Sequence, residues 1–343
     1  MSLRLRSVFF IGVASLIAWF LFLERTLLSP FILAAIFAYI FNPVIDFFFH
    51  KIKLPRSISI IIIYLSILIS IIGLSVVITG QVVNEFSELQ KAVGSLAIHT
   101  KDQIEALPIF LKSPIQDALL SIDESKILAS FDVFRFFPQA FSKIIGLFIF
   151  LFSGFYFLKE GKNMIDKTLQ FVPDNYVPDI RILIRKINTV FGGYLRGQLF
   201  MVILISFILF TGLSILGVRF ALILSIFSGI AEIVPFIGPI TAGAVAASIV
   251  LLTGSISFGL SPFQGALFVA LFYFLVRQFQ DYFIAPHIMS KIVGLHPLII
   301  LFAVLSGERM GGLLGVVLAV PIAAVIRIVL EFSLEKINQR KVS

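Results

Sequence analysis

Long apolar runs separated by short polar breaks dominate this sequence. A helix needs about 20 apolar residues to cross the hydrocarbon of a bilayer, and several runs reach or approach that length. The candidate spans are residues 8–23, 27–49, 58–79, 141–158, 198–217, 220–252, 263–285 and 311–332. The pattern therefore predicts an all-α, polytopic integral membrane protein with about eight transmembrane helices.

The run at residues 220–252 is too long and too irregular for one simple span. It contains an acidic residue, Glu232, followed by Pro235, Gly238 and Pro239. Proline lacks a backbone N–H and clashes with the preceding helical turn, so the helix must break or kink here. The segment is one broken span, a re-entrant hairpin or two spans, and the sequence leaves these three alternatives open.

Two polar segments are predicted to lie outside the membrane core. Residues 81–140 carry an excess of acidic side chains, and their apolar positions recur at helical spacing. We expect them to form an extracytoplasmic helical segment. Residues 159–197 carry an excess of basic side chains and include a basic amphipathic stretch, which is typical of a helix in the membrane interface. Asp179 is expected to cap the start of that helix.

The distribution of basic residues predicts the orientation of the chain. Lys and Arg gather after the second span, in residues 159–197 and in the C-terminal tail, and such basic loops stay in the cytoplasm. With eight spans, both termini are cytoplasmic in the cell membrane. The predicted organisation is three spans in 1–80, an external segment at 81–140, a fourth span at 141–158, an amphipathic segment at 159–197, a transport core at 198–335 and a cytoplasmic tail at 336–343.

Composition narrows the class of protein further. The chain is 59% hydrophobic and 13% charged, whereas soluble domains are about 45–50% apolar and about 25% charged. It has no cysteine, and we find no metal-ligand spacing, phosphate-binding loop or nucleophile–base motif. We therefore expect no enzyme activity, no catalytic residues, no bound metal and no cofactor. The net charge of +8 reflects membrane orientation, and we expect no nucleic-acid partner.

Glu232 is the first candidate binding residue. An ionisable side chain inside a span costs at least about 2.5 kcal/mol on insertion scales, so it must face protein, water, a cation or a proton. Transporter sites are commonly built where helices break, and Pro235, Gly238 and Pro239 mark such a break. We predict that freed backbone groups and this carboxylate bind a solute or an ion. The alternative is that Glu232 only pairs with a neighbouring helix.

A second polar cluster lies near the end of the span at residues 263–285. Arg277 and Asp281 are four residues apart, so they are expected to pair on one helix face. Gln278 and Gln280 add neutral hydrogen-bonding groups. The cluster either lines a cavity or anchors the helix at the interface.

Glycines mark a third region. Gly311 and Gly315 form a G-x-x-x-G pair, which permits close helix approach. With Gly312 and Pro321 they are candidates for packing or gating.

These residues occur in an order that is similar to a known family. The stretches are 38–43 (AYIFNP), 157–161 (FLKEG), 194–198 (YLRGQ), 232–239 (EIVPFIGP), 286–297 (PHIMSKIVGLHP), 311–315 (GGLLG) and 319–324 (AVPIAA). The chain resembles the autoinducer-2 exporter family of bacterial and archaeal permease-like transporters. The resemblance implies a permease of about eight spans and a homo-oligomer, such as a pentameric ring. Members of the family are associated with export of the quorum-sensing signal autoinducer-2, and others with sodium or lithium exchange for protons.

Three hypotheses follow. The leading one is a secondary transporter that exports small polar molecules, such as an autoinducer-2-like signal. The first alternative is a sodium (lithium)/proton antiporter, in which Glu232 alternates between a monovalent cation and a proton. The second alternative is a non-transporting membrane scaffold whose working surface is residues 81–140. Under each hypothesis, we expect the protein to contact membrane lipid.

Overall fold

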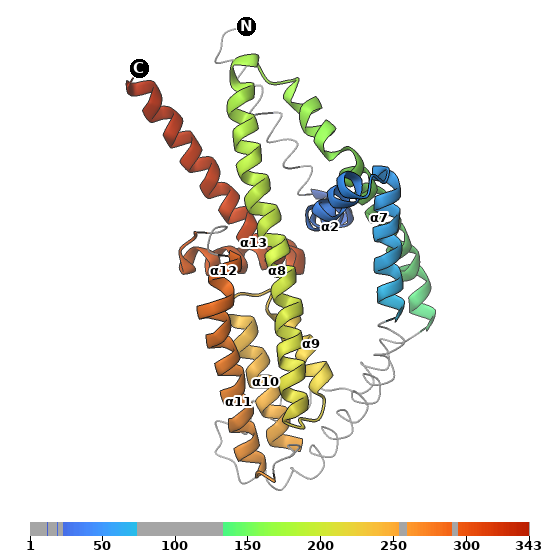
Figure 1. The fold of residues 1–343 in the computed structure, drawn as a ribbon, viewed down its shortest axis with the longest axis vertical. Helices are drawn as coiled ribbons and strands as arrows, with labels where there is room; N and C mark the ends of the chain where they lie inside the picture. The colour runs from blue at the N-terminus through green and yellow to red at the C-terminus, as the bar shows by residue number, and fades with distance from the viewer. Residues whose placement is uncertain are drawn as a thin grey trace. The chain divides into compact units, whose positions relative to one another are not determined.

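The structure is a computed structural model that describes residues 23–73, 133–253, 259–289 and 294–342, together with residues 12 and 19. Every regular element in these ranges is helical. Figure 1 shows the helices of these ranges. The chain divides into two compact units. The first contains Met1–Tyr64, Phe137–Leu195 and Leu305–Ser343, and the second contains Leu65–Phe136 and Arg196–Val304.

Six helices in the described ranges are long and apolar enough to cross a membrane. They are α2 (Arg25–Lys51), the helix Arg56–Gly73, α7 (Val133–Leu169), α8 (Val177–Ile215), α11 (Pro262–Phe279) with its continuation through η2 (Gln280–Ile284) and α12 (Ala285–Met289), and α13 (Pro297–Val342). Two shorter apolar helices, α9 (Ala221–Ala231) and α10 (Ile237–Thr253), fill the remaining apolar run. The all-α, multi-pass prediction is therefore confirmed. The predicted first span, residues 8–23, lies outside the described residues apart from residues 12, 19 and 23. Residues 81–132 of the predicted extracytoplasmic segment also lie outside them.

The later part of the predicted amphipathic segment is continuous with the predicted span that follows it. After α7 the chain passes through the short 3-10 helix η1 (Asp174–Tyr176) and then enters α8, which runs for 39 residues without interruption. The helix does not end near residue 198, because no proline or strained residue interrupts it there. The turn lies instead beside Pro173, which directly precedes η1.

Polar contacts within the first unit explain the charge on this part of α8. Asp179 Oδ1 lies 2.7 Å from the Lys336 Nζ of α13, and the Lys186 ammonium lies 5.6 Å from the centre of the Phe332 ring. Asn188 Oδ1 accepts a hydrogen bond of 2.7 Å from the Tyr39 hydroxyl of α2. Asp179, which the sequence predicts to cap this helix, lies within the first turn of α8 and forms an ion pair with α13.

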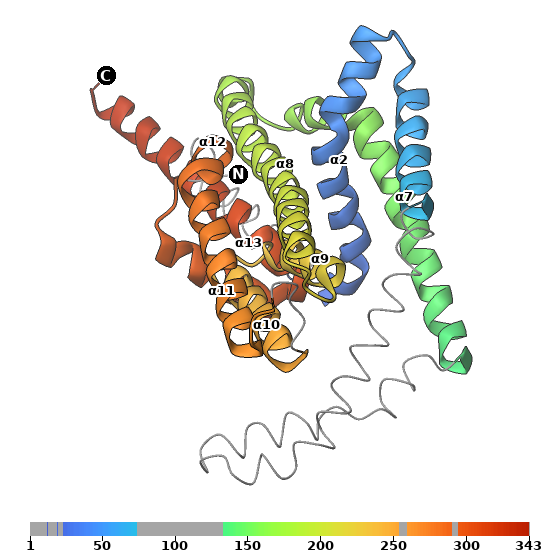
Figure 2. The ribbon, with the colours of Figure 1, turned by 60° about the horizontal axis from the view of Figure 1, so that its bottom comes forward.

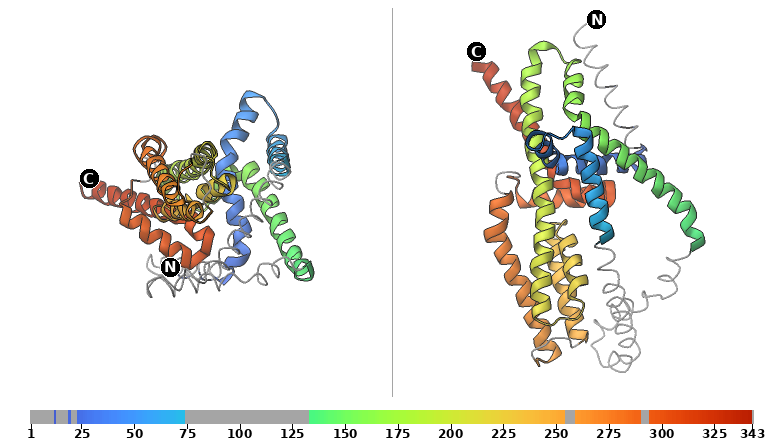
Figure 3. Two further views of the ribbon diagram at one scale, coloured as in Figure 1. Left: turned by 90° about the horizontal axis from the view of Figure 1, so that it is seen from below. Right: turned by 45° about the vertical axis from the view of Figure 1, so that its right-hand side comes forward.

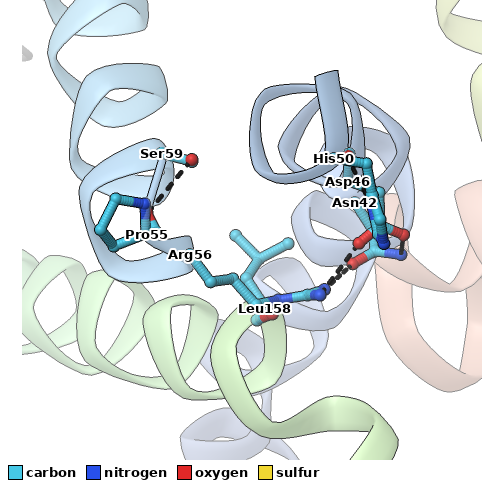
Figure 4. A network of polar contacts seen from close by, with 7 residues as sticks. All are labelled: Asn42, Asp46, His50, Pro55, Arg56, Ser59 and Leu158. Carbon is cyan, nitrogen blue, oxygen red and sulfur yellow. Dashed lines mark hydrogen bonds and ion pairs between the residues drawn. The ribbon is translucent and has the colours of Figure 1, made fainter. Parts of the chain in front are cut away.

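One arginine joins three helices of the first unit (Figure 4). Arg56 donates through Nε to Leu158 O of α7 at 2.6 Å. It donates through Nη1 to Asp46 Oδ1 at 2.9 Å and through Nη2 to Asn42 Oδ1 at 2.6 Å, both on α2. Figure 2 shows α2, α7 and the helix Arg56–Gly73 beside one another. Arg56 therefore ties the two adjoining helices to its own.

Helix α13 changes direction at Gly312, whose φ of 56° and ψ of −137° are non-helical. The chain folds back so that a Cβ on Gly315 would lie 1.8 Å from the Gly307 carbonyl oxygen. A Cβ on Gly311 would have nothing within 4 Å. The close glycine contact therefore joins Gly307 and Gly315, and Gly311 takes no part in it. A packing or gating role for Gly311 stays a prediction.

The second unit is a bundle of α9, α10, α11 and residues 196–215 of α8 (Figure 3). Its interior is apolar and is formed by Ile205, Leu209, Leu213, Val218, Phe220, Ala221, Leu224, Ala242, Ala246, Val250, Val269 and Tyr273. Small residues on α10 let α11 approach closely, because a Cβ on Gly243 would lie only 3.3 Å from the Tyr273 ring. This packing holds α9 and α11 at the candidate site.

Candidate functional site

The break predicted in residues 220–252 is a tight turn between two short helices. Helix α9 ends at Ala231 and α10 begins at Ile237. Phe236 has a left-handed φ of 66°, a conformation that costs a non-glycine residue about 1–2 kcal/mol. A Cβ on Gly238 would lie 1.7 Å from the Ala231 carbonyl oxygen, so this position requires glycine. The segment is therefore a pair of helices joined at the acidic residue.

Backbone groups at this turn are already hydrogen-bonded. Val234 N donates to Ala231 O at 3.0 Å, and Gly238 N donates to Val234 O at 3.0 Å. The Gln198 side chain of α8 donates through Nε2 to the Glu232 backbone oxygen at 2.9 Å. Buried backbone groups are almost always paired in this way. These three carbonyls therefore already have partners within the protein, and solute binding by backbone groups at the break stays a prediction.

The Glu232 side chain is held by two residues of the neighbouring α11–η2 helix. Its Oε1 accepts a hydrogen bond of 2.5 Å from Gln280 Nε2 and another of 3.3 Å from Arg277 Nη1. Glu232 is only 8% exposed and Gln280 only 3%. Buried charges require such partners because water no longer solvates them. This carboxylate therefore links α9 to the end of α11.

Arg277 bridges two carboxylates. Its Nε donates to Asp281 Oδ2 at 2.9 Å, which confirms the predicted pair four residues apart. The backbone from Gln280 to Ile284 is a π-helix, and this wider turn is frequent at functional sites. Arg277 thus has a buried carboxylate, Glu232, on one side and a half-exposed one, Asp281, on the other.

A cavity of about 260 Å³ adjoins this cluster. Most of its wall is apolar, and its polar groups come from α9, α11 and η2. It is lined by Ile205, Leu209, Ser228, Glu232, Pro239, Ile240, Ala242, Gly243, Ala244, Ala247, Ala270, Tyr273, Phe274, Val276, Arg277 and Gln280.

The predicted site residues occupy different positions. Those that line the cavity are Glu232, Pro239, Arg277 and Gln280. Pro235 and Gly238 belong to the turn that places Glu232. Gln278 and Asp281 do not line the cavity. The remaining candidates, Gly311, Gly312, Gly315 and Pro321, belong to the first unit.

Three polar side chains at the site were not predicted. They are Gln198, which holds the Glu232 backbone oxygen, and the pair Ser228–Tyr273, whose hydroxyl oxygens are 2.8 Å apart. Ser228 and Tyr273 each lie four residues before a predicted residue, Glu232 and Arg277 respectively. That helical spacing was the available signal.

The chemistry of the cluster is hydrogen bonding and charge pairing. In the described part of the chain, no three His, Cys, Asp or Glu residues are grouped to hold a metal ion. A few polar side chains line a mostly apolar cavity, which is the usual composition of a small-molecule binding site.

Known proteins resemble this chain along most of its length. The model of the "AI-2E family transporter" matches residues 9–335. YueF of Bacillus subtilis (strain 168), named for a proposed role in transport, is 30% identical over 322 residues, covering 90% of this chain and 84% of YueF. YrrI of the same organism is named likewise and is 24% identical over 328 residues, covering 89% and 86%. A relative in Methanothermobacter thermautotrophicus, also named for proposed transport, is 23% identical over 283 residues, covering 82% and 81%.

This chain therefore belongs to the AI-2E transporter family. Its long apolar helices make it a multi-pass membrane protein, and the family gives it a role in transport.

Proposed function

We propose that this protein is a secondary transporter that exports a small, neutral, polar solute of the autoinducer-2 type. The solute binds in the cavity beside Glu232. The observation that carries this proposal is that Glu232, Arg277 and Gln280 contact one another and all line a cavity of about 260 Å³.

The charges of the cluster favour a neutral solute. Glu232 and Asp281 flank the single positive charge of Arg277, so a solute carboxylate would meet an excess of negative charge. Gln280 and the remaining N–H groups of Arg277 can donate hydrogen bonds, and carboxylate oxygens can accept them. Hydroxyl groups both donate and accept, so a sugar-like solute suits this set.

The antiporter alternative also assigns the central role to Glu232. A bound sodium or lithium ion would have to replace or tolerate the Arg277 guanidinium, whose Nη1 lies 3.3 Å from Glu232 Oε1. A positive charge at that distance repels a cation. The geometry therefore supports the solute transporter over the antiporter.

The scaffold alternative places the working surface in residues 81–140, most of which lie outside the described residues. It predicts that changes at Glu232 are silent for function. A buried carboxylate with partners on a second helix, beside a cavity, supports a role for Glu232 in binding instead. We retain the homo-oligomeric ring and cytoplasmic termini as part of the proposal.

A transport assay in reconstituted vesicles tests the proposal. The purified protein is reconstituted, and uptake of autoinducer-2 is compared with cation-dependent proton movement under an imposed proton gradient. We expect autoinducer-2 uptake in the wild type and its loss in Glu232→Gln, which keeps the size of the side chain but removes its charge. The matched control is Glu331→Gln, an exposed glutamate of the first unit.

Two results would overturn the proposal. Normal autoinducer-2 uptake by Glu232→Gln would remove this carboxylate from solute binding. Sodium- or lithium-dependent proton movement without autoinducer-2 uptake would establish the antiporter.

A further inference from the structure

The cavity contains a second polar pair beyond the charged cluster. Ser228 Oγ and Tyr273 Oη lie 2.8 Å apart, and both residues line the cavity. They are 3% and 8% exposed. Ser228 lies one turn before Glu232 on α9, and Tyr273 lies one turn before Arg277 on α11. The two helices therefore carry two polar contacts spaced roughly 6 Å apart along the helix axis.

The hydrogen bonds fix which groups of this pair can donate. Ser228 Oγ lies 2.6 Å from the Leu224 carbonyl oxygen, which can only accept, so the serine proton is directed there. Ser228 must then accept the hydrogen bond that joins it to Tyr273, and the tyrosine proton is used in that bond. The Tyr273 oxygen is left as a hydrogen-bond acceptor.

The charged contact also leaves an acceptor. Glu232 Oε1 accepts from both Gln280 and Arg277. Among the described residues no donor contacts Glu232 Oε2. The cavity therefore offers two acceptor oxygens, one from Tyr273 and one from Glu232, about one helical turn apart.

We propose that Tyr273 is a specificity-determining residue and that the cavity selects solutes with at least two hydroxyl groups, one for each acceptor. This inference rests on the proposed function, because it places the transported solute in the same cavity. A solute that lacks one hydroxyl leaves a buried acceptor unpaired, which is costly. Substituting Tyr273 therefore changes which solutes are transported.

The first test compares two probes in proteoliposomes. The first probe is autoinducer-2. The second is a set of deoxy analogues, each with a different hydroxyl group replaced by hydrogen. The wild type is expected to transport autoinducer-2 faster than at least one deoxy analogue by roughly threefold to tenfold, the range for one buried hydrogen bond. Tyr273→Phe removes the acceptor oxygen but keeps the ring. The ratio of the autoinducer-2 transport rate to that of the deoxy analogue is therefore expected to fall to about one. Tyr282→Phe is the matched control, since Tyr282 lies on η2 and is 73% exposed.

A second variant tests the direction of the hydrogen bond. Ser228→Ala removes the acceptor of the tyrosine proton, so Tyr273 becomes free to donate. This variant is expected to transport an O-methyl analogue, which accepts but does not donate at that position, faster relative to autoinducer-2 than the wild type does. A role in packing alone would slow all probes equally and would not change this preference.

The outcomes separate the two proposals. Suppose that the wild type transports autoinducer-2, and that the ratio of its transport rate to that of each analogue is the same in the wild type and in every variant. The role of Tyr273 is then overturned, while the proposed function stands. The same conclusion follows if a variant lowers the transport rates of all probes by the same factor. If the wild type transports none of the probes, the proposed function fails, and the inference fails with it.

Discussion

Replacing Arg277 with methionine should destabilise the second unit, because Glu232 would lose its positively charged partner. Methionine keeps much of the length of the arginine stem while removing every donor. Gln280 would remain as a neutral donor to Glu232 Oε1. The same change also removes the partner of Asp281, but that carboxylate is 44% exposed and can be solvated.

The expected magnitude follows from burial. Breaking a fully buried ion pair by removing one partner costs about 3–5 kcal/mol. The Arg277 side chain is 25% exposed and that of Glu232 is 9% exposed, so we expect the lower end, about 3 kcal/mol. In the double variant Glu232→Gln with Arg277→Met the unpaired charge is gone, and the loss should fall to about 1 kcal/mol, the size of one hydrogen bond.

The assay is the free energy of unfolding in mild detergent as the mole fraction of sodium dodecyl sulfate rises, followed by far-ultraviolet circular dichroism. The control is Arg181→Met, which breaks an exposed ion pair with Asp166 and should cost less than about 1 kcal/mol. The reasoning is refuted if the double variant loses as much stability as Arg277→Met alone, or if Arg277→Met loses no more than the control.

Further changes test other contacts. Gly315→Ala, Gly311→Ala and Arg56→Met are compared by the same unfolding measurement, and Gly238→Ala by solute uptake. Gly315→Ala places a methyl group against a backbone carbonyl and should cost about 1–3 kcal/mol of unfolding free energy. Gly311→Ala meets open space and should be neutral or stabilising. Equal effects of the two substitutions would contradict the bend in α13. Gly238→Ala clashes with the α9 carbonyl and should also reduce solute uptake, because it moves the turn beside the cavity; unchanged uptake would contradict this. Arg56→Met removes the ion pair of Arg56 with Asp46 and should cost about 2 kcal/mol. A neutral result would show that the three helices associate without that ion pair.

Much of the fold follows from hydropathy alone. The apolar runs matched helices because a bilayer leaves the backbone little alternative to internal hydrogen bonding. The pairs Arg277–Asp281 and Arg327–Glu331 were predictable for a similar reason, since residues four apart share one helix face.

Long-range contacts could not be predicted in this way. Asp46 reads as an ordinary helix-end residue, yet it binds Arg56, because that contact depends on how α2 and the next helix come together. The bend at Gly312 likewise depends on one residue in a left-handed conformation within a run of helix-compatible sequence.

The candidate site shows the same division. Glu232, Pro235 and Pro239 marked the break because charge and proline are unusual in an apolar run. The spacing of Ser228 and Tyr273 from Glu232 and Arg277 places them on the same helix faces, but only the structure shows that the two hydroxyl groups contact each other.

The most direct test of the central claim, that the cavity beside Glu232 binds the transported solute, uses the absence of cysteine from the chain. A single cysteine is introduced at Ala247, which lines the cavity, or at the neighbouring Ser248, which is exposed and does not line it. The rate of labelling by N-ethylmaleimide is then measured in detergent with and without autoinducer-2. We predict that autoinducer-2 slows labelling of Ala247→Cys, leaves that of Ser248→Cys unchanged, and loses its effect when Glu232→Gln is added. Labelling at position 247 that is unaffected by autoinducer-2, or protection that is equal at both positions, would contradict the claim.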